Sequence, residues 1–323
     1  MSKELKLKHV EGIGPAAVTK LKDAKIETVQ DLATQSIESL TESVGLSKDL
    51  ANKYIQNAHK LLRENDQIGP EFIDGNEALV KREAIERVKT GSAKLDEFLY
   101  GGFETQAITE LYGEFGSGKS QLCHALAVQC SKQLKDGGLG ANTRCIYIDT
   151  EGTFRPERIK QMAMQQELDP QYVLRNIKIC KVYNSGHLET IMENLSTYVK
   201  EFNARMIVVD SIIALHRADY TGRGTLADRQ QKIQAIMHRL LRLAEIYGLV
   251  IVITNQVTTS PDTFFGDPTK PTGGNIIGHN STYRIYLRKS GKNRLIKMID
   301  SPYHDSLDIK IQITPKGIED AAE

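Results

Sequence analysis

The sequence contains no tryptophan, no CxxC pair, no long hydrophobic run and almost no net charge. Its longest apolar run, LVIVIT at 249–254, has the length of a buried strand, whereas a membrane-spanning helix needs about 18 apolar residues or more. The first residues, MSKELKLKHV, lack the apolar centre of a secretory signal. We therefore expect a chain that does not bind membranes. It should work in the cytoplasm, beside the nucleoid of a prokaryote, or in the nucleus of a eukaryote.

The missing CxxC pair excludes a zinc ribbon and a thioredoxin-like redox motif. The four cysteines are expected to pack in the core of a protein that is kept reduced. A hydrophobic fraction of 40% and a charged fraction of 26% exclude a disordered chain. The length of 323 residues is enough for about two domains.

The net charge is only +1, from 42 basic and 41 acidic residues, so the chain as a whole does not attract a polyanion. Charge is nevertheless gathered in patches. Residues 284–297 contain six basic residues and no acid, and residues 215–242 contain six against two aspartates, whereas the tail from Asp300 is acidic. The two basic stretches are candidate contacts for phosphate groups.

Residues 1–65 form a predicted all-α N-terminal domain, because they are rich in helix formers and have no strong strand pattern. Two glycine turns, GIGPAA at 12–17 and VGLSKD at 44–49, each precede a helical apolar pattern. This arrangement resembles a pair of helix-hairpin-helix units, in which N–H groups at a helix start can face a phosphate. A plain four-helix bundle with glycine turns is the alternative.

Residues 66–84 form a predicted linker, because Gly69, Pro70 and Gly75 interrupt the helical pattern over 66–80. The linker carries Phe72, a large apolar side chain in a segment that offers it little cover. A lone exposed phenylalanine would need no explanation, but the residue is also suited to fill a pocket on another subunit.

Residues 85–323 form a predicted α/β core. Apolar runs at 107–113, 144–149, 206–210 and 249–254 alternate with amphipathic helical stretches such as 187–201 and 226–247. This pattern indicates a mostly parallel sheet that is covered by helices on both faces. Such a sheet binds its ligand beyond the C-terminal ends of its strands, where the motifs below all fall.

The first motif is a full match to GxxxxGK[ST], directly after the strand AITELY and before the helical run QLCHALAVQC. Loop N–H groups would surround the phosphates, Lys119 would reach the β- and γ-phosphates, and Ser120 would ligate Mg²⁺. The sequence therefore predicts a site for ATP. Its loop residues are Gly113, Glu114, Phe115, Gly116, Ser117, Gly118, Lys119 and Ser120.

Three further polar residues follow strand ends. Asp210 ends MIVVD in the position of a Walker B aspartate beside the metal, unless it simply ends a buried strand. Glu151 lies two residues past another strand and can orient or deprotonate the attacking water, or it only starts a helix. Gln256 in ITNQV stands where a γ-phosphate could be sensed.

Four segments together resemble the RadA-type recombinases of the RecA superfamily: YIDTEGTFRPERI at 147–159, YTGRG at 220–224, ITNQV at 253–257 and FFGDPTKPTGGNIIGH at 264–279. The resemblance covers nearly the whole chain, including the N-terminal domain and the linker. It implies a RecA-like P-loop ATPase that is stimulated by DNA and requires ATP and Mg²⁺. It also implies a helical filament or ring of identical subunits that binds single-stranded DNA and exchanges its strand with double-stranded DNA in recombinational repair.

The resemblance also implies residue roles. Catalysis falls to Glu151, Lys119 and Gln256, and the metal to Ser120 and Asp210. The remaining roles are adenine stacking by Arg158, completion of a neighbour's site by His279 and Asp300, a first DNA loop with Arg217, Arg223 and Arg229, and polymerisation through Phe72 and Gly75.

Residues 257–280 match the second DNA loop of these recombinases and are rich in proline and glycine. We expect a long structureless loop that lines a DNA channel. In it, Phe264 and Phe265 would contact bases or pack on their own domain.

Two positions depart from the family pattern. Gly75 stands where the polymerisation motif Phe-x-x-Ala has alanine, and Asp305 stands where the cap over ATP usually has a second proline. Two alternatives to a recombinase are an accessory RecA-like ATPase that loads or remodels a recombinase, and a DNA-binding scaffold that binds ATP without hydrolysis. The N-terminal domain, Phe72 and the full second loop argue against the first, whereas Glu151 and Gln256 argue against the second.

Overall fold

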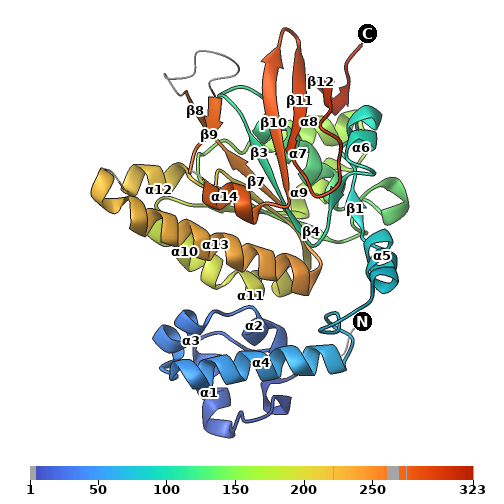
Figure 1. Cartoon of the computed structure of the whole chain (residues 1–323). Coiled ribbons are helices and arrows are strands. Elements are labelled where there is room, and N and C mark those ends of the chain that lie inside the picture. The colour runs from blue at the N-terminus through green and yellow to red at the C-terminus, as the bar shows by residue number, and fades with distance from the viewer. Residues whose placement is uncertain (1–4, 221, 260–268, 274, 323) are drawn as a thin grey trace.

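The structure is a computed structural model that describes residues 5–220, 222–259, 269–273 and 275–322. A helical N-terminal region lies beneath a large α/β core, and a short helix-containing segment connects the two (Figure 1).

The core is built on a nine-stranded sheet, which confirms the predicted α/β class. The strands from β10 to β5 run parallel, whereas β11, β12 and β13 extend the sheet in antiparallel order. In spatial order the strands are β13 (Gly317–Asp320), β12 (Asp308–Thr314), β11 (Asn293–Asp300), β10 (Tyr283–Ser290), β3 (Ala107–Tyr112), β7 (Val250–Asn255), β6 (Ala204–Asp210), β4 (Arg144–Asp149) and β5 (Ile177–Lys181).

The four predicted strands are the central ones, β3, β7, β6 and β4. They read as continuous apolar runs because almost every residue in them is buried, on both faces of the sheet. The edge strand β5 alternates between buried and exposed residues, and β11 carries charge, so neither has that pattern.

Helices cover both faces of the sheet. One face packs against α6 (Ala93–Phe98), α7 (Lys119–Cys130), α8 (Pro156–Gln165) and α9 (Pro170–Arg175). The other packs against α10 (Ser185–Glu193), α11 (Leu195–Glu201), α12 (Ala214–Asp219), α13 (Leu226–Tyr247) and α14 (Asn275–Asn280). Among the described residues, no helix has the length and apolar character needed to cross a membrane.

The helix predicted over 226–247 is α13, but the one predicted over 187–201 is two helices, α10 and α11. Asn194 ends the first and begins the second, and its side-chain amide donates to the carbonyl of Thr190 at 2.7 Å. An asparagine side chain that bonds to the backbone competes with the helix, which accounts for the break.

The N-terminal region consists of η1 (Leu7–His9), α1 (Pro15–Asp23), α2 (Val29–Ala33), α3 (Ile37–Val44) and α4 (Lys48–Glu64), around a hydrophobic cluster of its own. Both glycine turns lie where they were expected: Gly14 caps α1, and Gly45, in the left-handed conformation, ends α3. The domain boundaries at 65 and 85 stay predictions.

The N-terminal region contacts α11 and α13 of the core (Figure 1). The fully buried carboxylate of Asp31 accepts from Lys200 Nζ at 2.5 Å and from the Tyr247 hydroxyl at 3.2 Å. Arg242 donates to the carbonyl of Thr34 at 2.9 Å. The docked position is therefore fixed by an ion pair and directional hydrogen bonds.

The linker prediction was wrong in one respect, because residues 66–84 contain the helix α5 (Gly75–Glu83). Asp74 caps it by accepting from the N–H groups of Asn76 and Glu77, so Gly75 begins a helix and does not interrupt one. None of the α5 residues is buried. The short antiparallel pair β1 (Arg87–Val88) and β2 (Phe103–Glu104) follows.

The expected structureless loop over 257–280 is also partly wrong. Its start, β8 (Val257–Thr259), pairs with β9 (Thr269–Pro271), and its last residues form α14. The amide of Asn255 holds the end of β9 by donating to the carbonyl of Thr272 at 2.8 Å. Phe264 and Phe265 lie outside the described residues.

Candidate nucleotide-binding site

The glycine-rich loop Gly113–Ser120 connects the end of β3 to the start of α7. A Cβ on Gly113 would lie 2.1 Å from the carbonyl oxygen of Leu287 on β10, so the close packing of loop and sheet requires glycine. Gly118 caps α7 with φ of +109°, a conformation that favours glycine. The loop therefore presents the free N–H groups of the α7 N-terminus, which is the geometry that binds phosphates.

Lys119 begins α7, and its ammonium group lies within the loop. Its Nζ donates to the carbonyl oxygens of Gly113 at 2.8 Å and Glu114 at 2.9 Å. Burial lowers the pKa of Lys119, while the nearby carboxylates of Asp210 and Glu151 act in the opposite direction. Lys119, Asp210 and Glu151 therefore lie close enough for the two carboxylates to act on the charge of the ammonium group.

Asp210 ends β6 and is almost fully buried. Its Oδ2 accepts from the Tyr147 hydroxyl at 2.8 Å, and its Oδ1 accepts from the Thr254 hydroxyl at 2.5 Å. Burial raises the pKa of Tyr147, and the charge of Asp210 raises it further. The two hydroxyls fix the carboxylate at the end of the sheet.

Glu151 projects from the turn that follows β4. Asp149 holds this turn by accepting from the N–H groups of Thr153 and Phe154, both at 3.1 Å. The exposed carboxylate of Glu151 accepts from Gln256 Nε2 at 2.8 Å. Two candidate residues that lie 105 positions apart in the sequence are thus brought into contact.

Gln256 also joins the first predicted DNA loop to the site. Its Oε1 accepts from the guanidinium of Arg217, an exposed residue of α12, at 3.3 Å. A continuous hydrogen-bonded chain therefore runs from Arg217 through Gln256 to Glu151.

Arg158 lies on α8, where burial lowers its pKa. Its guanidinium donates to Gln121 Oε1 at 2.8 Å and to the carbonyl oxygens of Thr314 and Pro315 at 2.5 and 3.2 Å. It is therefore fixed between α7 and the turn after β12.

Arg294 on β11 was not singled out from the sequence, although it belongs to the basic stretch 284–297. Its Nε lies 3.5 Å from the position of a Cβ on Gly118, so the side chain adjoins the phosphate loop. This Nε is buried and has no hydrogen-bond partner among the described residues. The concentration of basic residues was the signal that could have identified it.

Other predicted residues lie apart from the loop. His279 on α14 and Asp300 at the end of β11 are exposed, and neither bonds to the loop within the described parts of the chain. Arg223 begins η3 (Arg223–Thr225), and Arg229 lies on α13 with a buried Nε. Phe72 is 90% exposed.

Ser120 and Asp210 supply hard oxygen donors, which fit Mg²⁺. Mg²⁺ is usually held by one or two protein oxygens together with water and phosphate. Among the described residues there is no group of three or more histidine, cysteine, aspartate or glutamate side chains that could hold a metal ion.

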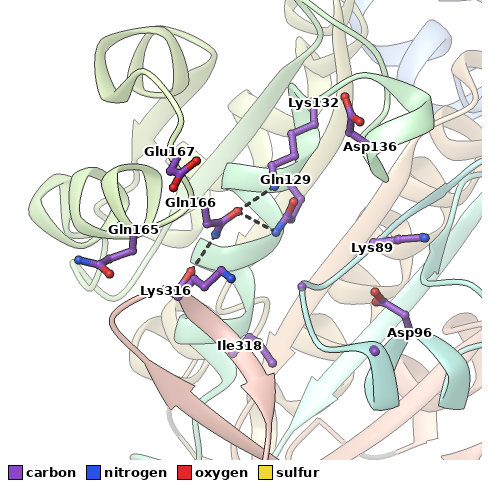
Figure 2. A pocket seen from close by; sticks show the side chains of 12 residues that line it. Lys89, Asp96, Gln129, Lys132, Asp136, Gln165, Gln166, Glu167, Lys316 and Ile318 are labelled. Carbon is purple, nitrogen blue, oxygen red and sulfur yellow. Dashed lines mark hydrogen bonds between the residues drawn. The ribbon is translucent and has the colours of Figure 1, made fainter.

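A cavity of about 540 Å³ lies elsewhere, at the C-terminal end of α7 (Figure 2). Gln166 lines it and is bonded to Gln129, Lys132 and the carbonyl of Lys316 (Figure 2). Because α7 has 12 residues, its two ends are about 18 Å apart, so this cavity is separate from the phosphate loop. Three lysines and three acids line it, so it has no net charge that would select an ion: Lys89, Lys132, Lys316, Asp96, Asp136 and Glu167.

Comparison with known proteins identifies two families in the chain. The family described as Rad51 matches residues 81–321, and the SAM-like helix-hairpin-helix tandem matches residues 4–60. A DNA repair and recombination protein RadA of Cenarchaeum symbiosum (strain A) is 44% identical over 318 residues, which are 98% of this chain and 79% of that protein. Because the Rad51 family model covers most of the chain and the RadA relative is 44% identical over nearly all of it, the chain belongs to the Rad51 family and is a RadA-type member of the RecA superfamily.

Proposed function

We propose that this protein is an ATP-dependent DNA recombinase, which assembles on single-stranded DNA and exchanges that strand with double-stranded DNA in recombinational repair. The observation that carries the proposal is the hydrogen-bonded chain from Arg217 through Gln256 to Glu151. It links Arg217, one of the basic residues assigned to the first DNA loop, to the acid that would act on water. We expect the protein to work in the cytoplasm, beside the nucleoid, of a prokaryote, or in the nucleus of a eukaryote.

In this proposal the loop N–H groups and Lys119 bind the phosphates of ATP, and Arg158 supports the adenine. Glu151 orients the attacking water and accepts its proton, while Gln256 fixes the carboxylate that does so. Mg²⁺, when bound with the nucleotide between Ser120 and Asp210, would neutralise phosphate charge.

DNA would bind along Arg217, Arg223 and Arg229 and through the glycine turns of the N-terminal region. A phosphate that recruits the guanidinium of Arg217 would alter its bond to Gln256 and, through it, the position of Glu151. DNA binding would thereby stimulate hydrolysis, which is what a DNA-dependent ATPase requires.

The exposed apolar side chains support a head-to-tail assembly. One group lies on the connecting segment, α5 and the end of β11, and includes Phe72, Leu79 and Ile299. Another, Ile179 and Tyr183, lies on or just after the edge strand β5. Because β11 and β5 are six strand spacings apart, Ile299 and Ile179 are separated by roughly 29 Å. One subunit can bury both only by using different faces toward two neighbours, and such a contact builds an open helix or a ring.

The test is strand exchange between labelled oligonucleotides, with and without ATP. The parent should exchange strands only with ATP, and Lys119→Ala should abolish nucleotide binding because the phosphates lose the charge that the loop supplies. Glu151→Gln should bind ATP as the parent does but hydrolyse it about a hundredfold more slowly or worse. ATP affinity unchanged in Lys119→Ala would contradict the site, and exchange without ATP would contradict the function.

A further inference from the structure

Glu104, in β2, is a carboxylate whose side chain is only 1% exposed. It accepts hydrogen bonds from Arg82 of α5 at 2.8 Å and from Arg87 of β1 at 2.8 Å. It also accepts from the hydroxyls of Tyr283 of β10 at 2.6 Å and Tyr303 at 2.5 Å. One buried charge thus joins the connecting helix, the small β1–β2 pair, the central sheet and the segment after β11.

The Glu104 cluster is made of Glu104, Arg82, Arg87, Tyr283 and Tyr303, and the carboxylate at its centre is ionised at neutral pH. Burial alone would raise the pKa of Glu104, but the hydrogen bonds from the two tyrosines and the two arginines outweigh it and hold the pKa at about 2. Each donor therefore bonds to a full negative charge, and such bonds are the strong ones.

The segment 301–307 has no regular secondary structure and follows Asp300 directly. Its Tyr303 ring lies 4.4 Å from the ring of His304, which in turn stacks 4.4 Å from Tyr100. The guanidinium of Arg82 lies 5.5 Å from the centre of the Tyr303 ring. The Glu104 cluster therefore ties this irregular segment, which directly follows β11, to α5 and the β1–β2 pair.

We propose that the Glu104 cluster is a positioning device for the subunit interface, with Glu104, Arg82 and Tyr303 as positioning residues. It makes α5, which directly follows the Phe72 segment, and the Asp300 segment one rigid unit. That unit presents Asp300 to the nucleotide of the neighbouring subunit at a fixed geometry. The inference rests on the proposed function, in which Asp300 completes a neighbour's ATP site.

The consequence is an effect across subunits. Tyr303→Phe deletes one hydroxyl and keeps the ring stacking, so it should loosen the segment and leave the fold intact. Since a hydrogen bond to a charged group changes an equilibrium by about tenfold or more, turnover of ATP on single-stranded DNA should fall about tenfold. Subunit association, measured by light scattering, should change little. Arg82→Gln tests the same cluster from the α5 side, and Arg82→Lys should restore part of the loss.

Mixing subunits distinguishes positioning from a defect within the altered subunit. Tyr303→Phe is mixed with an excess of Glu151→Gln, which hydrolyses poorly but carries an intact Glu104 cluster. Most Tyr303→Phe nucleotide sites then face an intact Asp300 segment, so hydrolysis per Tyr303→Phe subunit should rise toward the parent value. The double variant Glu151→Gln/Tyr303→Phe should give no rise. Tyr172→Phe is the matched control. Tyr172 lies on α9, and its hydroxyl donates to the carbonyl of Ser131, so this variant also loses one hydroxyl and should behave as the parent.

Normal turnover in both Tyr303→Phe and Arg82→Gln would overturn the inference while leaving the proposed function in place. An equal rise with the double variant, or no rise with Glu151→Gln, would also overturn it. If the unfolding temperature of Tyr303→Phe were lower than that of the parent, Arg82→Gln would be used in its place in the same mixture. A parent without DNA-stimulated hydrolysis would overturn both the inference and the proposed function.

Discussion

Phe72 offers the sharpest test of assembly, because it is 90% exposed and contributes almost nothing to the packing of its own subunit. Burying a phenylalanine side chain in a neighbour's pocket stabilises the contact by about 2–3 kcal/mol. Phe72→Ala should therefore weaken association between subunits about thirtyfold to about 150-fold. Phe72→Glu should weaken it further, because a charge would have to enter the same apolar pocket.

The assay is light scattering or sedimentation over a range of protein concentrations, with thermal unfolding measured in parallel. The concentration at which half of the subunits assemble should rise by the factor above, while the unfolding temperature stays the same. Leu134→Ala is the matched control, since Leu134 is a 54% exposed apolar residue on η2 (Leu134–Asp136). It should change neither measurement.

A second substitution tests the same contact in the opposite direction. A methyl group on Gly75 meets no atom within 4 Å in the subunit, and Gly75 begins α5. Gly75→Ala should therefore keep the fold, stabilise α5 by about 0.5–1 kcal/mol and restore the small side chain of the family motif, so assembly should strengthen. Oligomers of Phe72→Glu as large as those of the parent would refute the reasoning.

Three further outcomes are expected. Replacing Arg217, Arg223 and Arg229 by alanine should weaken single-stranded DNA binding and reduce the salt slope by up to about 0.7 per lost phosphate contact. Arg217→Ala should have a larger effect than Arg229→Ala, because Arg217 is exposed whereas Arg229 is partly buried. An unchanged slope would place these arginines away from DNA. Glu104→Gln should destabilise the fold by about 3 kcal/mol at pH 7, because the pKa of Glu104 is about 2 in the folded protein and higher in the unfolded chain. The difference in stability between the two proteins should disappear as the pH falls from about 4.5 to about 2. Acid unfolding of both proteins tests this. Deleting residues 1–65 should leave a core that unfolds cooperatively and hydrolyses ATP but binds duplex DNA less tightly, and loss of folding on truncation would contradict the predicted boundary.

The sequence by itself determined the features that are local in the chain. The phosphate loop is one contiguous motif, and Gly113 and Gly118 are glycines for reasons of turn geometry and close packing that the motif already implies. The central strands were predictable because burial on both faces makes them continuously apolar, and α13 because its apolar residues recur with helical spacing. The helix α5 was missed because Gly75 was interpreted as a helix breaker, whereas the side chain of Asp74 caps a helix that begins at Gly75.

Tertiary structure decided every contact between distant segments. Gln256 reaches Glu151, Arg294 adjoins Gly118, and Tyr303 bonds to Glu104 only because the strand order of the sheet brings their elements together. Such pairs leave no periodic pattern, since each depends on one side chain and on the packing of two elements far apart in the chain. The residues of the candidate site could therefore be named from the sequence, whereas the contacts that position Glu151 and the Asp300 segment followed only from the folded sheet.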